Sequence, residues 1–316
     1  MGLYPYKFEP IYKPKIWGGR ALERLFGREL PDREIGESWE LADLKEGTSV
    51  VVNGPAAGAT LTDLTTELGD KLLGGAKPTD DGRFPLLLKF LDAQGILSLQ
   101  VHPDAAAVRE IGGDAALKTE CWYVVESRDG YIYKGIRPGV TREQFRKAVE
   151  ADEVEPLVRR IDVKAGDFHY LPAGTVHALG AGVVVAEVQT PSDTTYRVTD
   201  WGRGREIHVE RSMQCIHFEP AGDEAPGARG ETLLETEFFT VSRRELAEGG
   251  QRACETGRCT AVMVLMGELE LCHGGAYPSP VVAVAGETVL LPAGLEQHRA
   301  ATRTVCAYLE VALPKS

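Results

Sequence analysis

A turn motif that occurs twice constrains the fold of this chain more than any other feature. Residues 166–174 contain Gly, Pro and Gly at the spacing G-x5-P-x-G, and residues 286–294 repeat that spacing. In each copy an apolar, β-type run precedes the proline, and proline and glycine are the residues that form tight turns between strands. The sequence therefore predicts two related halves, each built from strands that are joined by a turn of this kind.

The boundary between the halves is predicted at residues 219–231. This segment (EPAGDEAPGARGE) is rich in Gly, Pro, Ala and acidic residues, which is typical of a linker. Short β-type runs follow it at regular spacing and predict a small β-barrel or jelly roll over residues 232–316. We therefore expect one domain over residues 1–218 and a second barrel, over residues 232–316, after the linker.

Two segments of the first half have helical patterns. Residues 60–75 place leucines at helical spacing and end in Gly-Gly, which favours a helix that stops there. Residues 141–161 open with Thr141 and Gln144 at the spacing of a capping box, and Pro156 is expected to divide this helix. The fold class is thus predicted as mainly β, with two barrels and helices inserted in the N-terminal half.

Four side chains of the first half form a candidate metal site. Gln100 and His102 are two residues apart on a predicted strand, so both point to the same face. His177 follows the first turn motif at the start of the returning strand, and Glu120 opens another apolar run. This nitrogen and oxygen ligand set suits one Zn²⁺ per chain, although Mn²⁺, Fe²⁺ or Co²⁺ would also fit.

Each of these residues alone has a simpler interpretation, because a single His or Glu on a strand is usually a hydrogen-bonded polar residue. Their combination with the turn motif favours metal binding. The second half offers His273 and His298 but no Gln-x-His pair. We therefore predict no second metal, and we expect His298 to be vestigial or surface-exposed.

Composition restricts the partners of the chain. A net charge of −12 does not favour a nucleic acid or an anionic membrane as a partner. The sequence has no apolar run of about 18 residues, so it predicts no transmembrane helix. The first residues lack the pattern of a signal peptide, so we expect a cytoplasmic protein, whose six scattered cysteines stay reduced. No sequence feature indicates an oligomeric state.

Seven segments of the chain also resemble a known family. They are IWGG (16–19), IGESWELAD (35–43), FPLLLKFLDA (84–93), LSLQVHPD (97–104), KTECWYV (118–124), PAGTVHALG (172–180) and SDTTYRVTDWGR (192–203). In this order, over about the first 205 residues, they resemble the short, bacillus-type class of type I mannose-6-phosphate isomerases in the cupin superfamily. QVHP followed by K-x-E and the TVHA turn is the specific part of this match.

The resemblance implies both fold and activity. It implies two cupin barrels, with zinc bound in the first. The implied reaction interconverts mannose-6-phosphate and fructose-6-phosphate through a cis-enediol, which requires an electrophile, a base and positive charge near the enediolate. The expected partner is thus a small phosphorylated sugar.

Two basic residues are expected to be catalytic. Arg197 matches the active-site arginine of the family, and its guanidinium stays protonated, which suits it to stabilise an oxyanion. Lys118 lies two residues before Glu120, so alternation places it beside the metal, where it could exchange protons. The simpler alternative to a catalytic role is that both residues lie on the surface, Arg197 in a salt bridge and Lys118 beside the ligand.

Five further residues are expected to bind the substrate. Ser98 shares a strand face with Gln100, and together with Arg203 it could hold the phosphate. The other three match family positions near the site: Lys89, Glu187 and Asp193. Glu187 and Asp193 could each orient the sugar or transfer protons, so the identity of the general base stays open.

Two other functions compete with the isomerase hypothesis. A cupin paralogue could bind sugars or regulate without turnover, but Arg197, Lys118 and the four predicted ligands are all present. An iron-dependent dioxygenase is a further alternative, because two histidines and a carboxylate also suit Fe²⁺. The Gln-x-His pair and the lysine beside Glu120 favour the isomerase.

Overall fold

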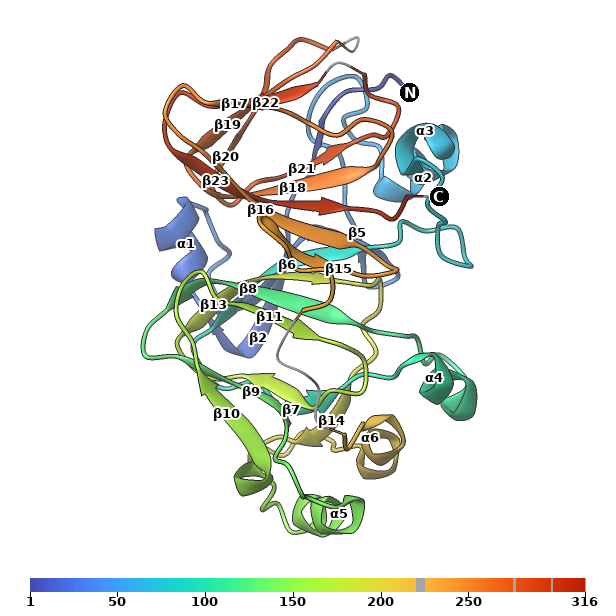
Figure 1. Cartoon of the computed structure of the whole chain (residues 1–316), viewed down its shortest axis with the longest axis vertical. Coiled ribbons are helices and arrows are strands. Elements are labelled where there is room, and N and C mark those ends of the chain that lie inside the picture. The colour runs from blue at the N-terminus through green and yellow to red at the C-terminus, as the bar shows by residue number, and fades with distance from the viewer. Residues whose placement is uncertain (220–224, 275–276, 297, 316) are drawn as a thin grey trace.

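The chain folds into two stacked β halves, shown one above the other in Figure 1. The computed structural model describes residues 1–219, 225–274, 277–296 and 298–315. The N-terminal half lies below and the C-terminal half above, with both ends of the chain beside the upper half. The mainly β fold predicted from the sequence is confirmed.

Two antiparallel sheets form the N-terminal half. The larger sheet has, in order, β11 (Phe168–Leu171), β8 (Glu120–Ser127), β13 (Val183–Gln189), β6 (Leu87–Ala93), β3 (Ile35–Leu41) and β2 (Ile11–Gly19). The smaller sheet has β10 (Val158–Asp162), β9 (Tyr131–Ile136), β12 (His177–Leu179), β7 (Leu99–Val101) and β14 (Tyr196–Thr199). A short pair, β4 (Asp43–Leu44) and β5 (Gly47–Thr48), lies outside both.

The C-terminal half also has two antiparallel sheets. Its larger sheet contains β1 (Tyr6–Lys7), β21 (Thr288–Leu291), β18 (Thr260–Met266), β23 (Cys306–Ala312), β16 (Thr240–Leu246) and β15 (Thr232–Glu235). The smaller sheet contains β17 (Gln251–Ala253), β22 (Arg299–Ala301), β19 (Glu268–Cys272) and β20 (Val281–Val284).

The two halves repeat one arrangement of eight strands. The order β11-β8-β13-β6 in the first half recurs as β21-β18-β23-β16, and β10-β9-β12-β7 recurs as β20-β19-β22-β17. The repeated turn motif occupies the same place in both halves, because it joins β11 to β12 and β21 to β22. The repeat in the sequence thus corresponds to a repeat in topology.

The division into residues 1–218 and 232–316 stays a proposal. Residues 220–224 of the predicted linker 219–231 lie outside the described residues, and β15 begins at Thr232. One strand crosses this division, since β1 pairs with β21 of the C-terminal sheet. The large sheets of the two halves also share one core, in which Phe90 and Tyr123 belong to the same cluster as Met263 and Leu309.

The helices are short and lie outside the sheets. They are α1 (Ala21–Phe26), α2 (Leu61–Leu68), α3 (Asp70–Leu73), α4 (Ala105–Ile111), α5 (Arg142–Glu150), α6 (Val209–Cys215) and the 3₁₀ turn η1 (Glu155–Leu157). Among the described residues, none of them is long and apolar enough to cross a membrane. The helices α4, α5 and α6 lie at the lower end of the molecule, beside the smaller N-terminal sheet.

The helix predicted over residues 60–75 is confirmed, whereas the one predicted over residues 141–161 is confirmed only in its first part. Beyond Pro156 the helical prediction is wrong, because the chain continues as strand β10 and pairs with β9. The segment 60–75 divides at Gly69 into α2 and α3, and Gly74 ends α3 in the left-handed conformation. Thr141 and Gln144 form the expected capping box of α5, after which η1 contains Pro156. The α3 end contacts the other half of the molecule, since Ala293 and Gly294 donate backbone hydrogen bonds to it.

Candidate active site

The four predicted ligands meet between the two sheets of the N-terminal half. In the smaller sheet, Gln100 on β7 is directly paired with His177 on β12. Glu120 is the first residue of β8 in the larger sheet, opposite Leu171 at the end of β11. His102 follows β7 and is almost completely buried. The site thus depends on one strand pair and on the packing of the two sheets.

The ligand atoms of three of these residues lie close together. Glu120 places Oε1 3.0 Å from His177 Nε2 and Oε2 3.5 Å from His102 Nε2. One ligand atom from each residue lies within 4.8 Å of the others. Gln100 joins the group, with its Nε2 3.3 Å from His177 Nε2. All three clustered residues are buried, so little water reaches their ligand atoms.

The histidines are oriented for metal binding by the backbone. His102 Nδ1 lies 2.9 Å from the Thr194 carbonyl oxygen, and His177 Nδ1 lies 2.8 Å from that of Thr175. A carbonyl oxygen only accepts, so each Nδ1 carries the proton and each Nε2 presents a lone pair. Two lone pairs then face the carboxylate of Glu120, an arrangement that is repulsive without a cation between them.

The charge states of these groups support the same conclusion. Burial and the neighbouring Lys118 ammonium lower the pKa of His102 to about 3, so its imidazole is neutral near pH 7. Burial alone would raise the pKa of Glu120, but the Lys118 ammonium beside it holds that pKa well below the usual value. Neutral imidazoles and an ionised carboxylate are the forms that bind a divalent cation. The residues present therefore fit one metal ion.

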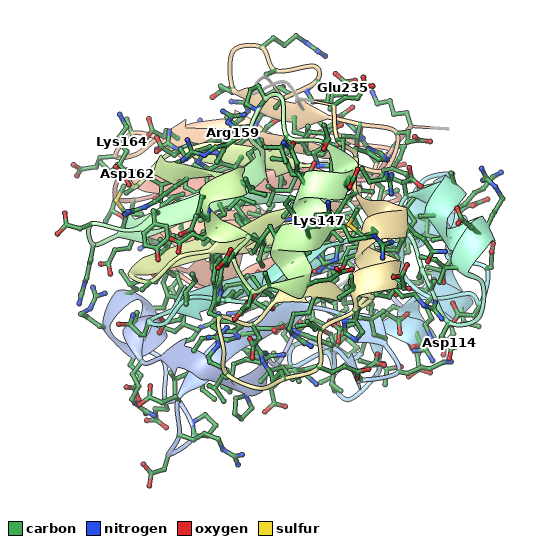
Figure 2. The ribbon with its side chains drawn as sticks, turned by 90° about the horizontal axis from the view of Figure 1, so that it is seen from below. Asp114, Lys147, Arg159, Asp162, Lys164 and Glu235 are labelled. Atoms are coloured by element: carbon green, nitrogen blue, oxygen red, sulfur yellow. The ribbon has the colours of Figure 1, made fainter. Side chains whose placement is uncertain are left out.

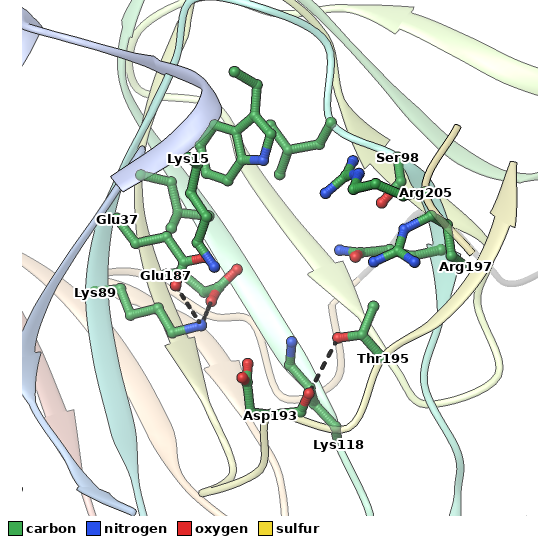
Figure 3. A pocket seen from close by; sticks show the side chains of 14 residues that line it. Lys15, Glu37, Lys89, Ser98, Lys118, Glu187, Asp193, Thr195, Arg197 and Arg205 are labelled. Carbon is green, nitrogen blue, oxygen red and sulfur yellow. Dashed lines mark hydrogen bonds and ion pairs between the residues drawn. The ribbon is translucent and has the colours of Figure 1, made fainter. Parts of the chain in front are cut away.

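A cavity of about 270 Å³ opens beside this cluster (Figure 3). It is lined by Lys15, Trp17, Glu37, Lys89, Leu91, Leu97, Ser98, Gln100, Lys118, Glu187, Asp193, Thr195, Arg197 and Arg205. Five of these residues are cationic and three are carboxylates, which leaves a surplus of two positive charges. The chain as a whole carries −12, so the cavity is a local site for an anionic ligand.

Lys89 stands at the centre of a buried charge network on one side of this cavity. Its Nζ lies 3.1 Å from Glu187 Oε1 and 3.6 Å from Glu37 Oε2. Each carboxylate also accepts an indole N–H, at 2.8 Å from Trp122 for Glu187 and at 2.7 Å from Trp39 for Glu37. The two carboxylates raise the pKa of Lys89 despite its burial, so it is a fixed cation.

Lys118 and Arg197 both face the cavity from beside the ligands. Lys118 Nζ lies 3.0 Å from Glu120 Oε2, as expected from the sequence, although Lys118 precedes β8 and is not itself in a strand. Arg197 on β14 is directly paired with Gln100 on β7, so their side chains share a face of the smaller sheet. Its guanidinium donates to the Glu206 carbonyl oxygen, while its buried Nε has no hydrogen-bond partner among the described residues.

Of the predicted substrate residues, four line the cavity and one does not. Ser98, Lys89, Glu187 and Asp193 are lining residues, whereas Arg203 is not. The Arg203 guanidinium instead binds the Asp200 carboxylate at 2.8 Å and the Ile96 carbonyl oxygen. Arg205 shares that carboxylate at 2.5 Å and does reach the cavity. The positively charged wall opposite Lys89 is therefore formed by Arg197 and Arg205.

Comparison with known proteins places this site in a family. The family model "Phosphomannose isomerase type I, catalytic domain" matches residues 6–124. The mannose-6-phosphate isomerase ManA of Bacillus subtilis is 37% identical over 312 residues, which cover 93% of this chain and 95% of that relative. The chain belongs to the type I phosphomannose isomerases.

Solved structures agree with this family assignment. The crystal structure of a mannose 6-phosphate isomerase from Bacillus subtilis is 31% identical, with a TM-score of 0.84 over 97% of this chain and 99% of that one. A zinc-bound mannose 6-phosphate isomerase structure, 18% identical, has a TM-score of 0.80 over 98% of this chain and 99% of that one. This second likeness shows the fold alone.

Three charged residues of this type I phosphomannose isomerase site were not predicted from the sequence. Lys15 and Glu37 line the cavity and form an ion pair at 2.7 Å, and Arg205 takes the place expected for Arg203. Lys15 and Glu37 lie close to, or within, the matched segments IWGG and IGESWELAD. The sequence did contain an indication of Lys15 and Glu37, because each lies two residues before a tryptophan of these segments.

Proposed function

We propose that this chain is a metal-dependent aldose–ketose isomerase that interconverts mannose-6-phosphate and fructose-6-phosphate through a cis-enediol. The buried His102–Glu120–His177 cluster beside a cation-rich cavity, in a type I phosphomannose isomerase, carries this conclusion. The surplus of positive charge in the cavity supports an anionic substrate, and the family supports a phosphorylated sugar. We also propose a cytoplasmic location for this enzyme.

The residues that would hold the metal are Gln100, His102, Glu120 and His177. Zn²⁺ suits this mixed nitrogen and oxygen set, and a bound Zn²⁺ supplies an electrophile that polarises the substrate oxygens. The carbonyl oxygens of Thr194 and Thr175 fix the two imidazole rings. Gln100 completes the set as a neutral ligand, through its amide oxygen after a flip of the amide group, because oxygen and nitrogen in such a group exchange places by rotation.

Two cations are proposed to act on the reacting atoms. Arg197 would stabilise the negative charge of the enediolate, because its guanidinium donates two parallel hydrogen bonds and keeps its proton. Lys118 would exchange protons with the sugar oxygens from its place beside Glu120, 3.0 Å away. Both residues act at the end of the cavity next to the ligands.

The carboxylates of the cavity are proposed to orient the sugar and to include the general base. Glu187 is fixed by Trp122 and Lys89, so it can accept hydrogen bonds from sugar hydroxyls without moving. Asp193 lines the same cavity from the loop before β14 (Figure 3). Proton transfer between C1 and C2 requires a carboxylate or lysine within hydrogen-bond reach of the C–H.

For the phosphate group, we propose Ser98 with Arg205. Ser98 is buried and lies on the wall that carries Arg197 and Arg205, opposite Lys89 and Glu37 (Figure 3). A hydroxyl and a guanidinium together donate to several phosphate oxygens. We propose Arg205 in place of Arg203 because both arginines bind Asp200 but only Arg205 of the two lines the cavity.

A coupled assay tests the proposed reaction. Purified protein should convert mannose-6-phosphate to fructose-6-phosphate, lose that activity with a chelator and regain it when Zn²⁺ is added. His177→Ala should lose most of the bound metal and the activity, since it removes a ligand. Turnover that survives complete removal of the metal would contradict the proposed metal dependence.

The preference for a phosphorylated substrate is tested separately. Mannose-6-phosphate should be turned over with a much higher kcat/KM than mannose, because binding energy from the remote phosphate is available in the transition state. Comparable values of kcat/KM for the two sugars would exclude the phosphate assignment of Ser98 and Arg205.

A further inference from the structure

Residues 15–18 form a bulge of β2 at one side of the cavity. In the pairing of β2 with β3, Pro14 and Gly19 are both opposite Ile35, so the four residues between them have no partners on β3. Backbone hydrogen bonds attach this bulge to the turn after β6, since the Trp17 carbonyl oxygen accepts hydrogen bonds from the N–H groups of Gln94 and Gly95. The bulge presents Lys15 and Trp17 to the cavity and leaves Ile16 71% exposed.

Lys15 is more loosely held than the other lysine on this wall. Its Nζ lies 2.7 Å from Glu37 Oε1, and its side chain is 35% exposed. Lys89 shares Glu37 but is 4% exposed and also has Glu187. If Lys15 moved away, Glu37 would keep Lys89 and the Trp39 indole N–H, so no buried carboxylate would be left unpaired.

The position of Lys15 allows it to reach a bound ligand. In Figure 3 it enters the cavity from the side of Glu37, Lys89 and Glu187, while Ser98, Arg197 and Arg205 face it from the opposite side. A ligand in the cavity would therefore lie between Lys15 and the two arginines. An anionic group with two charges offers a lysine ammonium a stronger partner than a carboxylate that is already shared with another lysine.

We propose that Lys15 is a specificity-determining residue that leaves Glu37 for the phosphate of the substrate, and so favours phosphorylated over neutral sugars. This inference rests on the proposed function, because it takes the anion to be the sugar phosphate. Glu37 is the resting partner of Lys15. Its ion pair with Lys15 is broken when the phosphate binds, and its ion pair with Lys89 remains.

Binding of inorganic phosphate to the zinc-loaded protein, measured by calorimetry, tests this exchange. Lys15→Met should weaken phosphate binding at least about tenfold, because a charge-assisted hydrogen bond is lost. Glu37→Gln should strengthen phosphate binding a few-fold, because Lys15 no longer has to leave an ion pair. In the double variant the gain from Glu37→Gln should disappear, since it acts through Lys15.

The control is Lys147→Met, which removes the same charge from α5. Lys147 is 72% exposed, pairs with Glu143 and lies on the outer surface at the lower end of the molecule (Figure 2). The Lys147→Met variant should bind phosphate with the affinity of the wild type. Circular dichroism and zinc content should be unchanged in Lys15→Met, whose side chain is partly exposed.

The outcomes separate this proposal from the proposed function. Phosphate affinity within twofold of the wild type in Lys15→Met would overturn the role of Lys15. If Glu37→Gln still strengthens phosphate binding by the full amount in the Lys15→Met background, the effect is a general electrostatic one. That result would also overturn the role of Lys15. If the expected affinities are found but mannose-6-phosphate is not turned over, the proposed function is wrong and the anion contact of Lys15 stands.

Discussion

Arg197 combines strand register with charge in a way that suits transition-state stabilisation. Its pairing with Gln100 places the guanidinium beside the ligand group, and its backbone N–H donates to His208 Nδ1 at 3.0 Å. Arg197 is not a metal ligand, so its role can be separated from metal binding. A substitution of Arg197 therefore tests the proposed mechanism most directly.

Arg197→Lys should lower kcat and kcat/KM together by more than roughly a hundredfold. A lysine ammonium keeps the charge but cannot donate two parallel hydrogen bonds to the enediolate, and loss of one such donor typically costs about 3 kcal/mol in the barrier. Steady-state kinetics with metal analysis measure the effect, and zinc content should be unchanged. Near-normal kcat with a raised KM would show that Arg197 binds the ground state, which would leave Lys118 as the better catalytic candidate.

Glu37 predicts how stability depends on pH. Burial alone would raise its pKa, but Lys89, Lys15 and the Trp39 indole hold the pKa at about 2. A carboxyl with a lowered pKa stabilises the fold fully above its unfolded pKa near 4.5, and this contribution is lost as the pH falls through 2. Lowering the pKa of Glu37 from 4.5 to about 2 on folding corresponds to about 3 kcal/mol in the free energy of unfolding.

In Glu37→Gln, the free energy of unfolding should thus fall by about 3 kcal/mol at pH 7, and its difference from the wild type should shrink as the pH falls below 4.5. Urea unfolding of chelator-treated protein at pH 7 and at pH values near 3.5 measures both quantities. Glu143→Gln on α5, where the carboxylate is 78% exposed, is the control and should change stability little at either pH. An undiminished difference in acid would contradict the assigned pKa.

Among the elements, the turn between β11 and β12 connects most directly to the metal ligands. Gly174 has φ +86, its N–H donates to the His102 carbonyl oxygen at 2.9 Å, and its carbonyl oxygen accepts from the His217 N–H at 3.0 Å. A Cβ at Gly174 would lie 2.5 Å from the His217 ring. This turn therefore ties both ligand histidines to the end of α6 through one glycine.

Gly174→Ala should lower zinc affinity about tenfold or more and destabilise the fold by about 1–3 kcal/mol, because the residue would be strained at positive φ and would displace His217. The matched control is Gly139→Ala, since Gly139 has φ +85 but a Cβ there would meet no described atom within 4 Å. It should lose stability and keep its zinc affinity. Competition with a chelator, together with thermal unfolding, distinguishes the two. Equal zinc affinity in both variants would show that the conformation of this turn does not affect metal binding.

In the whole molecule, the repeated topology shows which side chains occupy equivalent positions in the two halves. In the first half Leu171 is paired with Glu120, and in the second half Leu291 is paired with Thr260. The place of the carboxylate ligand is thus taken by a hydroxyl. His298 is only 6% exposed, so the expectation that it might be surface-exposed is wrong, and the vestigial alternative remains.

His298→Ala should leave zinc content and kcat nearly unchanged. The second half has Thr260 where the first has Glu120, and among the described residues the one cluster of three metal-binding side chains lies in the first half. Metal analysis and the coupled assay check both values, with His177→Ala as the positive control. A drop in metal stoichiometry for His298→Ala would reveal a second site.

Local patterns in the chain were sufficient for several parts of this structure. The expected contact of Lys118 with Glu120 is present, although β8 begins only at Glu120, because the two residues are so close in the sequence that their side chains meet without a regular strand. The capping box at Thr141 and Gln144 formed as expected, because it involves only four neighbouring residues. The two turn motifs likewise depend on proline and glycine conformations that are set within the turn.

Contacts between distant segments were decided only by the tertiary structure. Arg203 and Arg205 both bind Asp200, but only Arg205 of the two lines the cavity, because they lie in a loop that has no side-chain period. Lys15 lines the cavity because residues 15–18 leave the sheet register, and β1 joins the C-terminal sheet because its partner β21 lies far along the chain. Periodicity sets the face to which a side chain points, whereas register and packing between distant strands set what that side chain meets.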